Sequence, residues 1–192
     1  MRQRRVVVTG LGMISPVGLD VASSWAAILD GRSGISTIDS FDVSDYPTRF
    51  GGPIRDFDVA EYMSKKEAKR YDPFVHYGVA ASVQAFNDSG LELNDEYNDR
   101  VGVAVGSGIG GIGTILKTCV GFHEADYSAK KVSPFFIPSS IANMAAGQVS
   151  IQLNLHGPNI AAVSACTTGV HNIGLAARLI AAGDADAMLA GG

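Results

Sequence analysis

Charged residues are scarce in the last third of this sequence. Only 18% of the 192 residues are charged, and positions 134–192 contribute three of them, Arg178, Asp184 and Asp186. A typical globular chain carries about 25% charged residues, and a folded surface is normally rich in them. We therefore expect another part of the protein or a second subunit to cover this segment.

Other absences exclude whole classes of protein. The net charge of −4 leaves no broad basic surface for nucleic acid. No apolar run reaches the 18 residues typical of a membrane span, and the basic residues 1–5 do not lead into a signal peptide. The two cysteines, Cys119 and Cys166, are too few for a disulfide framework, so we expect a reducing, cytoplasmic environment. No spacing of histidines and cysteines indicates a metal site.

The hydrophobic pattern alternates between strand and helix periods. Strands are predicted over 6–8, 100–105, 159–165 and 187–190, and helices over 20–29, 73–89, 139–153 and 167–182, with a further helix that holds Cys119. This alternation predicts a layered α/β fold with a mostly parallel sheet and helices on both faces. The helix over 167–182 carries a single charge, which predicts burial between layers.

Cys166 is the first candidate for chemistry. It lies between a predicted strand and a predicted helix, where the side chain reaches the carboxyl edge of the sheet. Free N–H groups at the helix start favour a thiolate and can stabilise an oxyanion. The alternative is a small buried hydrophobic residue, which is also the interpretation of Cys119. His171 is rotated away from the sulfur around the helix, so we expect a packed, hydrogen-bonded histidine.

Two further patterns have an ordinary explanation as well as a functional one. Lys66, Lys69 and Arg70 share one helix face, which could dock an acidic partner or be a solvated surface. The glycines of 10–12 and 106–113 lack the residues that complete a nucleotide-binding loop, so they predict a tight turn and close backbone approach.

The residues around Cys166 resemble a known motif. The sequence of 164–174, Ser-Ala-Cys-Thr-Thr-Gly-Val-His-Asn-Ile-Gly, is similar to the nucleophile motif of type II β-ketoacyl-acyl-carrier-protein synthases. The segments 5–12, 106–111, 133–138 and 183–192 resemble, in order, the opening strand, two inner loops and the strand after the nucleophile helix of that family. Ser164 stands where the family often has threonine.

The resemblance implies a thiolase-like α-β-α-β-α sandwich, with 1–192 as its N-terminal half, in a cytoplasmic homodimer. It implies a decarboxylative Claisen condensation in fatty-acid elongation, in which Cys166 carries the acyl group. Ile109 and Phe136 would line the acyl tunnel. Acyl carrier protein would bring substrates on its phosphopantetheine arm without a bound cofactor. The residues implied to contact it are Lys66, Lys69, Arg70, Lys130 and Lys131.

The same resemblance places two catalytic histidines, a lysine and half of the oxyanion hole in a second half of the family pattern. We therefore expect that residues 1–192 alone cannot complete condensation. Two alternatives remain open at this point, half of a polyketide-type ketosynthase and a non-catalytic thiolase-like partner subunit. The Thr-Thr-Gly after Cys166 argues against the first alternative, and the presence of Cys166 argues against the second.

Overall fold

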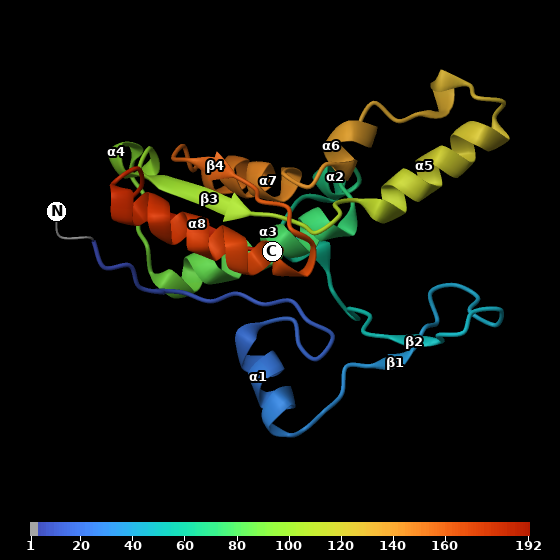
Figure 1. The fold of residues 1–192 in the computed structure, drawn as a ribbon, viewed down its shortest axis with the longest axis horizontal. Coiled ribbons are helices and arrows are strands. Elements are labelled where there is room, and N and C mark those ends of the chain that lie inside the picture. The colour runs from blue at the N-terminus through green and yellow to red at the C-terminus, as the bar shows by residue number, and fades with distance from the viewer. Residues whose placement is uncertain (1–3) are drawn as a thin grey trace.

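Three parallel strands form the sheet at the centre of the computed structural model, which describes residues 4–192 (Figure 1). The strand order is β4-β3-β5, with Val103 opposite both Asn159 and Leu189. A separate pair of two-residue strands, β1 and β2, is antiparallel. The elements in chain order are α1 (Val21–Leu29), β1 (Ser36–Thr37), β2 (Phe50–Gly51), η1 (Val59–Glu61), α2 (Lys65–Ala68), α3 (Pro73–Ser89), α4 (Asp95–Asn98), β3 (Val101–Val105), α5 (Ile112–Glu124), η2 (Ala129–Lys131), α6 (Phe136–Ser140), α7 (Met144–Leu153), β4 (Asn159–Ile160), η3 (Ala165–Thr167), α8 (Thr168–Ala182) and β5 (Ala187–Gly191).

Helices cover both faces of this sheet, as the sequence predicts. Because side chains alternate along a strand, Val101, Val103 and Val105 of β3 share one face, where they pack against α3 and α7. Gly102 and Ala104 share the other face, over which α8 lies (Figure 1). Small residues there let α8 approach the sheet closely. The hydrophobic core therefore lies on the α3–α7 side, and α8 forms a thinner layer opposite.

Local signals set the helix boundaries. The Asp72 carboxylate accepts a hydrogen bond from Phe74 N (3.4 Å) at the start of α3, and Pro73 occupies the first helical position. Gly90 ends the helix in the left-handed conformation, with a φ of 64°. Ser64 begins α2, because its hydroxyl accepts a hydrogen bond from Glu67 N (3.2 Å) and donates one to the Glu67 carboxylate (2.6 Å). The helix predicted over 73–89 is confirmed.

The predicted strand over 159–165 is wrong beyond Ile160. After that residue the backbone forms a hydrogen bond with a side chain instead of with a neighbouring strand. Ala162 N donates to Asn172 Oδ1 of α8 at 2.8 Å. The Asn172 amide also donates to Gly191 O at 3.1 Å. A fully buried asparagine thus ends the ladder and turns the chain toward α8.

Two other expectations need correction. Residues 6–8 form no strand, because the chain that follows is hydrogen-bonded to α3 side chains, with Leu11 N donating to Asp88 and Met13 N to Gln84. The predicted helix over 139–153 is broken into α6 and α7, because Gly111 N donates to Ser140 O where a continuous helix needs that carbonyl.

The burial of α8 between two layers stays a prediction. Helix α8 buries only one face, at Thr168, Asn172 and Ala176, whereas 69% of Val170 and 51% of Ile173 are exposed. The helix has almost no polar face, but residues 4–192 place the sheet on only one side of it. Among these residues, no helix combines the length and the apolar character that a membrane crossing requires.

Helix α5 and the segment that returns from it project away from the sheet (Figure 1). We refer to residues 112–135 as the arm. None of the thirteen residues of α5 is buried, and the arm rejoins the body at α6.

Candidate active site

Cys166 lies in η3, the short 3₁₀ turn that leads into α8, and it is exposed. The turn follows the carboxyl end of β4, so the thiol stands at the edge of a parallel sheet where α/β proteins place ligands. Ala165, directly before it, has a φ of 53°. A non-glycine residue in this region is strained, and such strain is typical of functional turns. Within residues 4–192 the thiol is exposed, whereas the alternative of a small buried hydrophobic residue predicts burial.

Side chains of α8 hold this turn in place. The Thr168 hydroxyl accepts a hydrogen bond from Ser164 N at 3.0 Å. The Ser164 hydroxyl and His171 Nδ1 lie 2.6 Å apart, so the histidine contacts Ser164. The prediction that His171 is hydrogen-bonded is confirmed, but the residue is exposed rather than packed. The backbone on either side of Cys166 is thus fixed to the first turns of α8.

The glycine-rich loop packs against the same turn. A Cβ added to Gly106 would lie 2.5 Å from Ala162 O, which is too close for any side chain. A Cβ at Gly108 would lie 3.2 Å from Ala165 O. The predicted close backbone approach is therefore confirmed for this loop, and it places the end of β3 beside the turn that holds Cys166.

This geometry suits attack on an acyl group. Within residues 4–192, Cys166 N–H has no hydrogen-bond partner, and it stands at the start of a fifteen-residue helix. Such an N–H group and the helix dipole can stabilise an oxyanion that forms on a bound thioester. Cys119 is equally exposed, contrary to the prediction of burial, because α5 projects from the body. Its mid-helix position provides no free N–H group.

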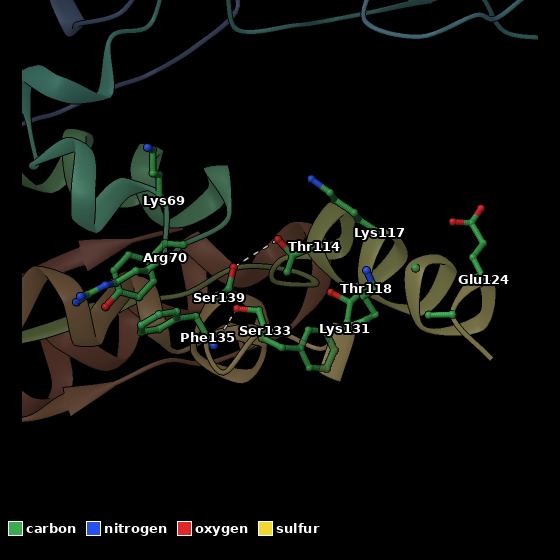
Figure 2. Close-up of a pocket in the computed structure, with 14 residues that line it drawn as sticks. Lys69, Arg70, Thr114, Lys117, Thr118, Glu124, Lys131, Ser133, Phe135 and Ser139 are labelled. Atoms are coloured by element: carbon green, nitrogen blue, oxygen red, sulfur yellow. Dashed lines mark hydrogen bonds between the residues drawn. The ribbon is translucent and has the colours of Figure 1, made fainter. Parts of the chain in front are cut away.

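A cleft of about 610 Å³ brings together several of the other predicted site residues (Figure 2). Its lining includes Lys69, Arg70, Lys131 and Phe136, which come from the end of α2, from η2 and from α6. Two basic residues predicted for docking, Lys66 and Lys130, are exposed but do not line this cleft. Ile109 lies elsewhere, in the glycine-rich loop, with 69% of its surface exposed. The structure therefore does not bring Ile109 and Phe136 into one pocket.

Sequence reasoning missed Thr114, Lys117 and Thr118, which line the same cleft from α5. Their spacing of three and four residues puts them on one helix face, and this polar stripe is visible in the sequence. Asp72 fixes the base of the arm here, because its carboxylate accepts from both Thr114 N (3.0 Å) and the Thr114 hydroxyl (2.8 Å).

A second cavity, of about 560 Å³, was also not predicted. Residues 10–14 and α3 form one side, while the glycine-rich loop, the end of β5 and Ile173 form the other. The lining is mostly apolar and includes Gly106 and Gly108, which pack beside the Cys166 turn. An apolar groove thus lies next to the candidate nucleophile.

A family described as "Beta-ketoacyl synthase, N-terminal domain" matches residues 3–192. This chain belongs to the β-ketoacyl synthase family. It is 58% identical over 198 residues to 3-oxoacyl-[acyl-carrier-protein] synthase 2 of Vibrio harveyi. The enzyme of the same name from Coxiella burnetii is 51% identical over 194 residues. Both matches cover 100% of this chain and 46% of the relative, so this synthase chain spans about half the length of the curated relatives it matches.

Solved structures agree with this assignment. A β-ketoacyl synthase from Burkholderia phymatum superposes with a TM-score of 0.80 at 27% identity, covering 94% of this chain and 44% of the other. The ishigamide ketosynthase/chain length factor gives 0.82 at 25% identity, covering 95% and 45%. The predicted thiolase-like α/β fold is therefore confirmed for this β-ketoacyl synthase chain, and so is the resemblance on which it rests.

Proposed function

We propose that this chain supplies the acylated nucleophile, Cys166, for the decarboxylative condensation that extends fatty acids by two carbons in a type II system. The observation that carries this proposal is the position of Cys166, exposed on a strained turn at the start of α8. The 58% identity to a relative named 3-oxoacyl-[acyl-carrier-protein] synthase 2 supports the same reaction.

The proposed chemistry has two stages. First, the Cys166 thiolate attacks the carbonyl of an acyl thioester on acyl carrier protein, the C–S bond to the carrier breaks, and the carrier leaves with a free thiol. Then malonyl-carrier protein loses carbon dioxide, and the carbanion attacks the Cys166 thioester. The C–S bond to Cys166 breaks, and the carrier bears a β-ketoacyl chain two carbons longer. The free N–H of Cys166 would stabilise the oxyanion in both attacks.

The proposal includes acyl carrier protein as the partner and its phosphopantetheine arm as the only carrier of acyl groups, with no resident cofactor. The basic residues Lys66, Lys69, Arg70, Lys130 and Lys131 are exposed or half-buried, so they are available to an acidic surface. One similar solved structure is a type II polyketide acyl-carrier protein in complex with its ketosynthase, at 26% identity and a TM-score of 0.77. Two free thiols suit a cytoplasmic setting.

The acyl pocket and the homodimer belong to the proposal together. Ile112, Leu116 and Val120 repeat every fourth residue along α5, and all three are exposed. Such a stripe is typical of a helix face that packs against another surface. A second copy seated on this stripe would also cover Ile109, which is exposed near the start of α5. Ile109 would then line the acyl tunnel at the interface, and Phe136 would line it from the base of the arm, on the cleft side.

A polyketide-type ketosynthase is the second candidate, because one of the similar structures is, by its title, a complex of a type II polyketide acyl-carrier protein with its ketosynthase. Its 26% identity is far below the 58% identity of the relative from Vibrio harveyi. Product length separates the two activities. A fatty-acid synthase enzyme releases a β-ketoacyl product after one condensation, whereas a polyketide enzyme accumulates chains with several ketones.

Trapping of the acyl-enzyme tests the proposal. The protein is incubated with acyl-[acyl-carrier-protein] and analysed by intact mass and peptide mapping. We expect one acyl group on Cys166, no acyl group on the Cys166→Ala variant, and normal acylation of Cys119→Ala, the matched control at the other exposed cysteine. Equal labelling of both cysteines, or acylation that survives Cys166→Ala, would show that the nucleophile is wrong.

A further inference from the structure

The cleft between the end of α2 and the arm is unusually rich in positive charge (Figure 2). Four basic side chains line it, and Glu124 is the one acid among its lining residues. Figure 2 shows Glu124 at the opposite end of the cleft from Arg70. The basic residues come from three segments of the chain, namely Lys69 and Arg70 after α2, Lys117 on α5 and Lys131 in η2.

Within residues 4–192, none of these four cations forms an ion pair, although other arginines of the chain do. The Arg70 guanidinium lies 4.9 Å from the centre of the Phe135 ring, which leaves the N–H groups at its edge free to donate. Like charges held in one concave site repel each other, and a bound anion removes this repulsion.

Hydroxyl groups stand among the cations. Ser133 Oγ accepts a hydrogen bond from Phe135 N at 3.1 Å, so its own proton is available for a ligand. Thr118 lies one helical position after Lys117 and lines the same cleft. The floor is rigid, because Thr114 is bonded to the buried Asp72 and lies 3.4 Å from the Ser139 hydroxyl. Donors from separate segments therefore converge on one fixed cavity.

We propose that this cleft binds a phosphate ester, with Lys117 and Thr118 as binding residues in addition to the basic residues already described. Guanidinium, ammonium and hydroxyl donors that converge from several sides match the tetrahedral array of phosphate oxygens. A cavity of about 610 Å³ also has room for a small phosphate-bearing group. This inference goes beyond the proposed condensation, because it needs neither Cys166 nor a carrier protein.

Calorimetric titration tests the site, with inorganic pyrophosphate as the probe and glutarate as a dicarboxylate control, both at physiological ionic strength. We expect saturable binding of pyrophosphate to the protein and much weaker binding of glutarate. The variant Lys117→Gln is expected to weaken pyrophosphate binding at least five-fold, and Thr118→Val two- to three-fold. The matched control is Lys130→Gln, which removes an exposed charge outside the cleft and should change the affinity less than two-fold.

The same titration distinguishes two sources of the phosphate. Binding of 4′-phosphopantetheine at least ten-fold tighter than pyrophosphate would assign the site to a phosphate carried on a pantetheine arm, and the reverse would assign it to a free small molecule. No saturable binding, equal binding of glutarate, or equal losses in Lys117→Gln and Lys130→Gln would overturn the proposal. None of these outcomes bears on acylation of Cys166, which is measured separately.

Discussion

The core strand β3 and the helix α5 of the arm differ sharply in burial, although both carry regularly spaced apolar residues. All five residues of β3 are buried, whereas none of the thirteen residues of α5 is. The strand is packed between α8 and the α3–α7 layer, while α5 contacts mainly α6 and η2. Apolar periodicity therefore shows that a face requires cover, but it does not show which part of a protein supplies the cover.

The largest effect is expected in the core, at strand β3. Val103 is fully buried between α3 and α7, so Val103→Ala leaves a cavity and loses two buried methyl groups. We expect a loss of about 2 kcal/mol in the free energy of unfolding, measured by urea denaturation. Leu116→Ala removes a larger side chain from the arm, but it is the matched control, because 65% of Leu116 is exposed. A loss as large as that of Val103→Ala would show that the arm is packed within the chain.

The second largest effect is expected at Asp72, which joins the core to the arm. Its carboxylate caps α3 and accepts two hydrogen bonds from Thr114 in the first turns of α5. We expect Asp72→Ala to lower the free energy of unfolding by about 1–2 kcal/mol and to speed amide hydrogen exchange at the start of α5. Asp20→Ala is the control, because Asp20 caps α1 only. Unchanged exchange in α5 would contradict a role for Asp72 in holding the arm.

The third effect is expected in the arm, on self-association rather than on folding. Leu116 lies in the middle of the exposed apolar stripe of α5, so Leu116→Lys should change the free energy of unfolding of one subunit by less than about 0.5 kcal/mol. The same variant is expected to weaken self-association at least ten-fold in sedimentation experiments, since a charge would enter the proposed interface. Thr118→Lys, on the cleft side of the helix, serves as the control. Equal weakening of self-association by both variants would show that the stripe is not part of the interface.

The sequence carried most of the information about elements that depend on local chemistry. The caps at Asp72 and Ser64, the strand 101–105 and the turn position of Cys166 all follow from residue types and spacing. Features set by distant contacts could not be predicted. Asn172 ends β4 through a side-chain bond to Ala162, and a glycine-loop N–H divides α6 from α7.

The candidate site divides in the same way. Cys166 is recognisable from its own neighbours, whereas the cleft joins segments that are about fifty residues apart in the chain. Lys117 therefore gave only a weak signal, a polar stripe on an otherwise apolar helix. No local sequence pattern predicts that Lys69 and Lys131 line the same cavity.

The smallest predicted effect lies at the rim of the core, where a charged group stays exposed beside a buried strand. Hydrogen bonds from Arg100, at 3.2 Å, and from Arg4, at 2.9 Å, lower the pKa of Asp186 below its ordinary value. A carboxylate with a lowered pKa in the folded state adds stability above its unfolded pKa, and this contribution is lost as the pH falls below about 4. Asp186→Asn should therefore reduce the urea midpoint slightly at pH 6 and leave it unchanged at pH 2. Asp184→Asn is the control, because Asp184 forms no ion pair within residues 4–192. A loss for Asp186→Asn that persists at pH 2 would mean that the side chain acts through packing, as β3 does, and not through its charge.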